Sequence, residues 1–423
     1  MEVNINTLSE VLQEAEILVT DTELQPHFDR AYDKERARIE VKGFRKGKAP
    51  ISMIRKLYGE TIEHHALDDI ANDLYRTVMD ERNIRPIGQP SMINMDYKRG
   101  TEFRFKIQYE IRPDITLAGY KNVQVEKPVH HVTDDETEAE ILRLRRSNST
   151  LTPVDTVTDQ EHIVTGDVQE LDPVGTPLIG RKASGMKFYL ADESITTEIR
   201  QALGNATVGN SYRTRFEPTG TEETNRGAID VTIAVTKIEK VELPAFDDTF
   251  VSTLTKGKSA SVQMFRTNLS KDIERYWQEW SERKLADAIS SEIVRTHYFP
   301  VPDSLVRTLL DSFVEDIKGR SKDRALPKDF DEEKFRTESH PLAVWQAKWM
   351  LIKERIAEAE KIEVADDDLD DLAAKDAGRV GIEKNQLLQY YRQSTSVRDR
   401  LLTEKIMKFL VQHARISEKI IEQ

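Results

Sequence analysis

The sequence predicts a multidomain α+β protein, with an α/β head, a small β-rich module and a helical body with long arms. A chain of 423 residues exceeds what one hydrophobic core usually supports. Apolar residues alternate with period two in two separate stretches before residue 243, and follow a helical period from about residue 246. These changes predict four segments: a head (1–112), a linker with a helix (113–152), the β-rich module (153–243) and the helical body (244–423).

The head combines one strand pattern with one helix pattern. Over residues 102–112, apolar and polar side chains alternate strictly, which is typical of a sheet with one wet face. Over residues 61–83, apolar residues recur every four positions, as on one face of an amphipathic helix. Those apolar residues are Ile62, Ala66, Ile70, Leu74 and Val78. Pro86 and Pro90 then end the helical region.

The linker and the module differ in their patterns. Thr133 followed by Glu136 predicts a capping box at the start of a linker helix. The module is rich in glycine and proline, and its apolar residues alternate again at Ile229, Val231, Ile233 and Val235. This composition predicts a small β-rich domain.

The body begins with an unusually long helical pattern over residues 262–299. More than 30 residues without a break correspond to about 50 Å of helix rise. Its aromatic residues do not keep a heptad repeat, which disfavours a coiled coil. Further helical blocks around 343–361 and 386–423 predict helix to the end of the chain.

Composition excludes several classes of function. The net charge of -13 would repel a polyanion over most of the surface, so any contact with RNA has to be local. The absence of cysteine excludes disulfides, zinc knuckles, iron–sulfur clusters and thiol catalysis. With no signal peptide pattern and no apolar run of about 18 residues, we expect a cytoplasmic protein without membrane contact.

The most informative stretch is the octapeptide from Gly43 to Pro50. It is not a nucleotide-binding P-loop, because the glycine spacing is one residue short and Ala49 replaces the required Ser or Thr. A basic cluster surrounds it, opposed by one acidic residue, Glu40: Arg36, Arg38, Lys42, Arg45, Lys46 and Lys48. Composition alone favours a solvated charged turn, and the alternative is a contact for phosphate or an acidic protein.

This octapeptide resembles the signature of the trigger factor family almost letter for letter. The segments 242–250, 299–302, 343–348 and 364–369 also resemble family segments, in family order. The resemblance implies that the loop tip docks on the large ribosomal subunit beside the tunnel exit, touching a ribosomal protein and rRNA. The implied ribosome-binding residues are Gly43, Phe44, Arg45, Lys46, Gly47, Lys48 and Pro50.

The resemblance implies a ribosome-associated chaperone that binds unfolded nascent polypeptides and delays misfolding without ATP or any cofactor. It also implies a homodimer off the ribosome. Two alternatives stay open: an active peptidyl-prolyl isomerase with chaperone activity, and a ribosome-independent cytosolic holdase. The segment around Ile195 argues against the first, and the intact loop against the second.

In the family, the β-rich module resembles an FKBP-type prolyl isomerase. That chemistry needs an aromatic-lined apolar pocket rather than an acid or a nucleophile. Here residues 192–199 lack the proline, glycine and aromatic residue of the family pocket, and Thr219 follows Pro218 where the family has tyrosine. The remaining pocket candidates are Phe188, Tyr189, Tyr212 and Phe216. Packing in the core is the favoured alternative for these residues, so we expect a degenerate domain with weak or no activity and assign no catalytic residue.

The body carries the candidates for client binding. Apolar spots set among charges suit weak, reversible binding of unfolded chains. The candidates are Trp277, Trp280, Phe299, Phe313, Trp345, Trp349 and Met350. Packing within the body is the alternative for each of them. We expect no metal site, because the adjacent pairs His64–His65 and His130–His131 do not face one way and no cysteine completes a set.

Overall fold

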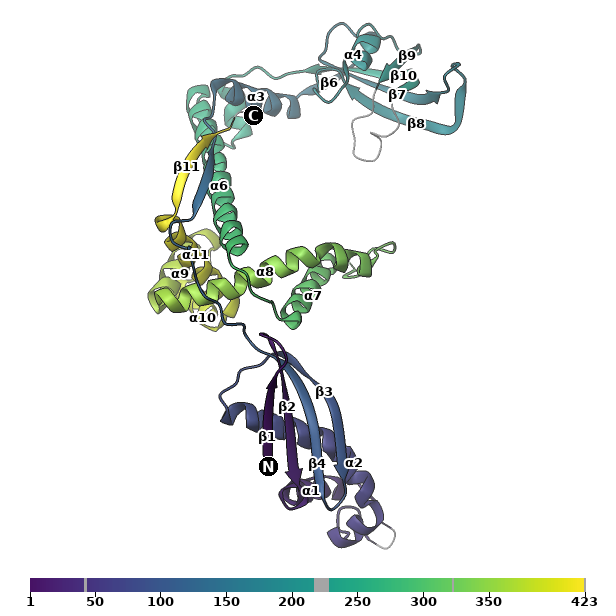
Figure 1. Ribbon diagram of the computed structural model, residues 1–423. Helices are drawn as coiled ribbons and strands as arrows, with labels where there is room; N and C mark the ends of the chain where they lie inside the picture. Colours follow the sequence, from purple (N-terminus) through teal and green to yellow (C-terminus); the bar gives the residue numbers. More distant parts are fainter. Residues whose placement is uncertain (42–43, 217–227, 322, 422–423) are drawn as a thin grey trace. The chain divides into compact units, whose positions relative to one another are not determined.

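The computed structural model describes residues 1–41, 44–216, 228–321 and 323–421 (Figure 1). The chain divides into two compact units. The first contains residues 1–128 and 282–419, and the second contains residues 129–281 and 420–423. Within the described ranges, no helix is long and apolar enough to cross a membrane.

The head, in the first unit, is a four-stranded antiparallel sheet in the order β1-β2-β4-β3. Two helices, α1 and α2, pack against it through a shared apolar core (Figure 1). The bounds are β1 (Glu2–Thr7), β2 (Leu12–Thr20), α1 (Asp21–Arg36), α2 (Ile51–Glu81), β3 (Ile87–Lys98) and β4 (Glu102–Glu110).

The two sequence patterns of the head are confirmed. In β4 the apolar residues of the alternation are buried and their polar neighbours are more exposed. The helical stripe of α2 is buried at every predicted position from Ile62 to Val78. Both faces enter the same core, which explains why one element shows period two and the other a helical period.

A buried carboxylate fastens α1 and α2 together. Glu63 of α2 accepts hydrogen bonds from the hydroxyls of Tyr32 (2.5 Å) and Tyr97 (3.2 Å) and from Arg99 Nε (2.7 Å). Burial, followed by the bond to Glu63, raises the pKa of Tyr32 to about 12. A buried carboxylate is stable only when it is paired, so Glu63 has to keep these partners. Its bond to Tyr32 therefore holds α1 against α2, the two helices that flank the 44–50 loop.

The body, in the first unit, is built around the C-terminal half of α6 (Val262–Thr296). At 35 residues α6 confirms the predicted long helix. The other helices are α7 (Asp303–Arg320), α8 (Glu332–Glu360), α9 (Asp366–Val380), α10 (Lys384–Gln393) and α11 (Thr395–His413). Buried residues of α6, α8 and α11 share one core, and α9 and α10 form a smaller one with the start of α11.

The prediction of helix to the end of the chain was wrong at its last segment. Residues Arg415–Ile420 form strand β11, which pairs with β5 (Gln124–Val129). Every residue of β11 is exposed, so no buried face marks it. The pairing partner lies almost 300 residues earlier in the chain, and a local pattern cannot reveal it.

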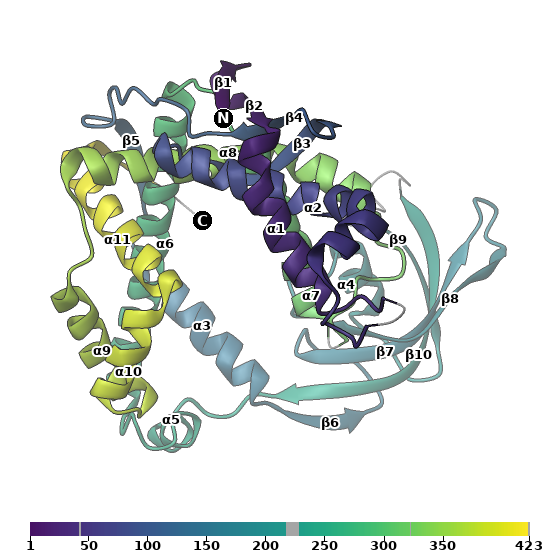
Figure 2. The same ribbon diagram turned by 90° about the horizontal axis from the view of Figure 1, so that it is seen from below.

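In the second unit, the module holds a five-stranded antiparallel sheet with β6-β10-β7-β8 in order and β9 beside β10. Figure 2 shows the long strands β7, β8 and β10. The bounds are α3 (Asp134–Ser147), β6 (Thr150–Val154), β7 (His162–Leu171), β8 (Pro177–Tyr189), α4 (Thr197–Leu203), β9 (Ser211–Phe216), β10 (Ile229–Glu242) and α5 (Asp248–Leu254). The predicted capping box of Thr133 and Glu136 at the start of α3 is confirmed.

Candidate functional site

The segment between α1 and α2 presents a short loop at residues 44–50. Val41 and Ala49 are buried at its two ends, with 6% and 3% of their surface exposed. Pro50 is the N-cap residue of α2, where its extended backbone leads into the helix. The loop is therefore anchored on both sides, and the side chains of Phe44, Arg45, Lys46 and Lys48 are exposed.

A tight turn shapes the tip of this loop. Lys48 N donates to Arg45 O at 2.9 Å, and Gly47 has a φ of +76°. A residue with a side chain rarely adopts this left-handed conformation, so glycine is the residue that fits it. Phe44 precedes the turn and is 41% exposed, which is unusual for a phenylalanine.

Three cations, Arg45, Lys46 and Lys48, lie close to Phe44 in the loop. The described part of the chain offers none of them an ion pair, and all three side chains are exposed. An aromatic side chain among free cations suits a surface that carries phosphate or carboxylate groups.

The other residues of the predicted basic cluster add less unpaired positive charge to this surface. Arg38 is paired with Glu35 at 3.2 Å, and Arg36 is only partly exposed. Lys42 and Gly43 lie outside the described residues. Among the described residues of the cluster, the exposed cations without an ion pair are thus those of the 44–50 loop.

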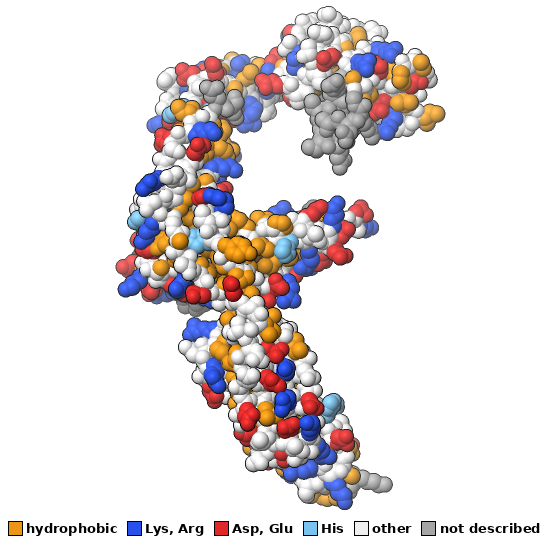
Figure 3. Space-filling view, in the orientation of Figure 1, with side chains coloured by type: hydrophobic (Ala, Val, Ile, Leu, Met, Phe, Trp, Pro, Cys, Tyr) orange, Lys and Arg blue, Asp and Glu red, His pale blue; other side chains and the backbone are white. Residues whose placement is uncertain are grey.

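The body presents a second candidate surface, which we call the body patch: Tyr298, Leu342, Trp345 and Trp349. The last three lie on one face of α8, at spacings of three and four residues. Tyr298 is 99% exposed and Leu342 is 52% exposed, and the Lys348 ammonium lies 5.6 Å from the Tyr298 ring. Figure 3 shows apolar side chains gathered where α7 and α8 lie.

The predicted client-binding residues occupy different environments. Trp345, Trp349 and Met350 are partly exposed on α8, and Trp277 and Trp280 are partly exposed on α6. Phe299 is only 6% exposed and belongs to the body core, and Phe313 packs against a smaller core beside α7. Sequence reasoning missed Tyr298 and Leu342, although Tyr298 precedes Phe299 and Leu342 precedes the segment 343–348, both of which it had singled out.

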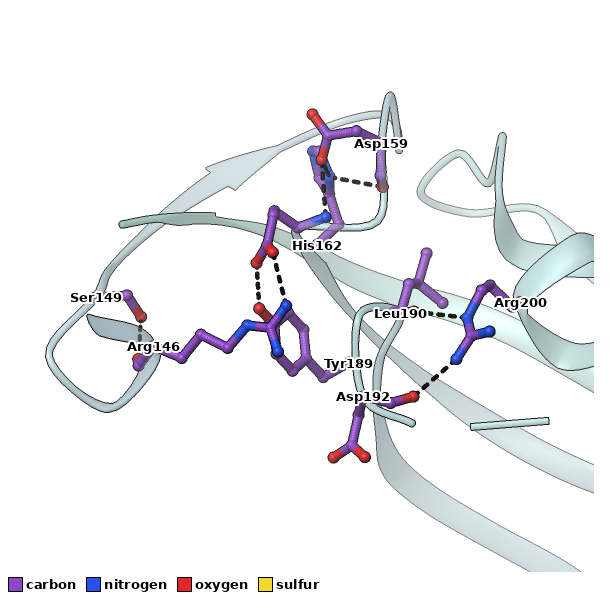
Figure 4. A network of polar contacts seen from close by, with 9 residues as sticks. Arg146, Ser149, Asp159, His162, Tyr189, Leu190, Asp192 and Arg200 are labelled. Carbon is purple, nitrogen blue, oxygen red and sulfur yellow. Dashed lines mark hydrogen bonds and ion pairs between the residues drawn. The ribbon is translucent and has the colours of Figure 1, made fainter. Parts of the chain in front are cut away.

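In the module, the pocket candidates are engaged with their own domain. Phe188 is buried in the core. The Tyr189 hydroxyl donates to Glu161, which also accepts from Arg146 at 3.0 Å, and the Arg146 guanidinium lies over the Tyr189 ring (Figure 4). Tyr212 accepts a hydrogen bond from Thr207 N at 2.8 Å through its hydroxyl. The Phe216 side chain lies outside the described part of the structure.

These contacts leave few aromatic side chains of the module free to bind a substrate. Burial, followed by the bond to Glu161, raises the pKa of Tyr189, so its hydroxyl stays protonated and committed to that carboxylate. An isomerase pocket needs aromatic faces free to receive a prolyl peptide. In the described module, two of the candidate rings are fixed by packing or by a charged network.

Comparison with known proteins gives a consistent result along the chain. The family model described as Bacterial trigger factor protein (TF) matches residues 1–144, and that of its C-terminus matches residues 261–412. The trigger factor of Chloroherpeton thalassium is 32% identical, over 98% of this chain and 97% of that protein. The chain belongs to the trigger factor family.

Other trigger factors are also similar to this chain over nearly its full length. That of Salinibacter ruber is 27% identical, over 100% of this chain and 96% of that protein. A solved structure described as "Promiscuous Substrate Recognition in Folding and Assembly Activities of the Trigger Factor Chaperone" aligns with a TM-score of 0.53. The alignment covers 97% of this chain and 99% of that chain at 18% identity, which shows a shared fold.

Family membership identifies the chain as a chaperone of the trigger factor type, as the octapeptide predicted. Membership of the trigger factor family implies binding to ribosomes and nascent chains. The two alternatives, an active peptidyl-prolyl isomerase with chaperone activity and a ribosome-independent cytosolic holdase, are not favoured.

Proposed function

We propose that this chaperone docks on the large ribosomal subunit through the 44–50 loop and holds unfolded polypeptides on the body patch. The observation that carries the first part is an exposed Phe44 beside three cations that the described chain leaves without an ion pair, on an anchored turn. The rest of the chain is strongly acidic, so this loop is a local site of positive charge.

The chemistry of the loop suits a surface of RNA and protein. Arg45, Lys46 and Lys48 can neutralise phosphates and acidic side chains, and an exposed aromatic ring supplies an anchor of the kind found at interaction hot spots. Contacts to phosphate release counterions, so binding weakens as salt rises. A turn that is already formed loses little conformational entropy on binding.

Co-sedimentation with ribosomes tests this docking. The wild-type protein is expected in the ribosome pellet, and a Phe44→Ala, Arg45→Ala, Lys46→Ala variant in the supernatant. A matched control removes two other exposed cations, Lys258 and Lys271, and is expected to pellet like the wild type. Wild-type protein that stays in the supernatant would refute docking. Equal losses of ribosome binding in both variants would show that overall positive charge, rather than the 44–50 loop, is responsible for binding.

The body patch supports the second part of the proposal. Its apolar residues lie among many charges, which favours weak contacts with unfolded chains over self-association. The partly exposed Trp345 and Trp349 offer large apolar faces, and Tyr298 stands almost fully in solvent. Such contacts need neither ATP nor a cofactor, because they form and break with the exposure of the client's own apolar residues.

A further inference from the structure

One histidine in the second unit lies at the meeting point of three elements and has no part in the proposed function. His130 follows β5, and only 7% of its side chain is exposed. Its Nε2 atom is 2.7 Å from Glu136 Oε1 on α3, and its Nδ1 atom is 3.2 Å from the main-chain oxygen of Ile421. Its ring lies on Trp277 of α6, with the ring centroids 4.3 Å apart.

Both ring nitrogens therefore face groups that only accept hydrogen bonds. A neutral imidazole has one N–H and can satisfy only one of these two acceptors, whereas an imidazolium ion donates to both. The positive charge is further favoured by the carboxylate of Glu136 and by the indole face of Trp277. The geometry thus fits a protonated histidine.

The bond to Ile421 fastens the C-terminal tail, by which we mean Ile421, the last residue described. Ile421 directly follows β11, whose pairing with β5 holds the preceding residues. The N–H of Ile421 donates to Val129 O at 3.0 Å, and its carbonyl oxygen lies 3.2 Å from His130 Nδ1. The side chain of Ile420, at the end of β11, is 66% exposed, so little apolar burial holds this end of the strand. Loss of the histidine bond removes the tie of the Ile421 carbonyl.

We propose that His130 is a pH-sensitive latch that holds the C-terminal tail at the stacked pair of His130 and Trp277 when protonated and releases it when neutral. On release, the neutral ring keeps its bond to one acceptor only, and Ile421 is free to move away from the stacked rings of His130 and Trp277. The latch is a conformational device of the linker and the tail, and it stands whether or not the 44–50 loop docks on ribosomes.

The direction of the pH dependence follows from the surroundings. The hydrogen bond with Glu136 is the main cause that raises the pKa of His130 above its ordinary 6.5, helped by the Ile421 carbonyl and opposed by burial. From α3 the ring faces Glu136, from the tail a main-chain carbonyl, and from α6 an indole without a titratable group. A raised pKa means that the latch is fully closed below 6.5 and opens as pH rises through the higher folded-state value.

A fluorescence titration of the full chain tests the latch. The chain has no cysteine, so an Ile421→Cys variant takes a single bimane label, whose emission tryptophan quenches at contact. We expect strong quenching at about pH 5.5 and its loss by about pH 8.5, a range that brackets the histidine pKa of about 6.5. Adding Trp277→Phe should reduce quenching at low pH, which identifies the quencher.

Three further variants make the test specific to His130. His130→Gln should abolish the transition, Glu136→Gln should move its midpoint down toward 6.5, and His131→Gln, at the exposed neighbouring position, should leave it in place. Quenching that does not change with pH in the parent protein would overturn the proposal. So would the same transition in His130→Gln.

Discussion

Gly47 sets the shape of the loop proposed to dock on the ribosome. Its φ of +76° closes the turn from Arg45 to Lys48, while the nearest atom to an added Cβ, the Ala37 Cα, is 3.8 Å away. A side chain would therefore fit in space, and only the backbone conformation would resist it. This separates the effect of turn geometry from the effect of side-chain contacts.

We predict that Gly47→Ala weakens ribosome binding about five- to thirtyfold. An alanine in the left-handed conformation costs roughly 1–2 kcal/mol. The free loop avoids this cost by adopting another conformation, so docking has to restore the turn and binding is weakened by that amount. Binding is measured by titrating labelled protein with ribosomes. Gly100→Ala is the matched control, because Gly100 has a φ of +73° in open space in the same domain. A loss of affinity in both variants would point to a weakened fold rather than to the loop.

Residue-level prediction succeeded where a residue's environment is local. The resemblance of the octapeptide to the family signature implied that Phe44 belongs to a docking loop, and its side chain is 41% exposed. Tyr298 and Phe299 show the opposite case, since neighbouring aromatic residues at one helix end are 99% and 6% exposed. The distant residues of α8 and α11 that complete the core decide which ring is covered, and the sequence order does not show them.

At the scale of elements, the module's sheet and α4 enclose a core that its own aromatic residues help to fill. We predict that the full chain accelerates a proline-limited refolding reaction weakly or not at all, because Phe188 is buried and Tyr189 is bonded to Glu161. The measurement compares refolding rates with and without catalytic amounts of the protein, with an active FKBP-type isomerase as the positive control. Acceleration comparable to that control would show that a working pocket exists.

Helix α9 depends on one carboxylate at its start. Asp368 accepts from Ala365 N at 2.7 Å and from Lys405 of α11, so it both caps α9 and fastens it to the neighbouring helix. Lys405 is the main cause that lowers the pKa of Asp368 from 3.8. A depressed pKa means that this stabilisation is complete above 3.8 and is lost as pH falls through the folded-state value.

Asp368→Ala should therefore increase hydrogen exchange in α9 at neutral pH, because losing the hydrogen bond from Ala365 N removes about 1 kcal/mol of local stability. The difference from wild type should vanish as pH falls below the folded-state pKa, once rates are corrected for intrinsic exchange. Asp367→Ala, at the exposed neighbouring position, is the control and should exchange like wild type. A difference that persists in acid would assign the effect to packing instead of charge.

For the whole molecule, a mixed head, a β-rich module and a helical body were predictable because strands and helices bury apolar residues at different periods. The burial patterns of α2 and β4 match those periods. Strand β11 was not predictable, because its partner β5 is distant in the chain and neither strand buries a continuous face. The same limit applies to the surroundings of His130, which bring together a linker, an arm helix and the end of the chain.

Client holding is a property of the whole molecule, since unfolded chains contact many weak sites at once. We predict that Tyr298→Ser and Leu342→Ser each reduce the suppression of aggregation slightly, and that the double variant reduces it severalfold. Both side chains are largely exposed, so their removal leaves the core intact. Light scattering from a diluted, denatured client measures the effect. Tyr390→Ser, which removes a tyrosine 64% exposed on α10, is the control and should protect the client like the wild type. Equal protection by the double variant and the wild type would place client binding elsewhere on the chain.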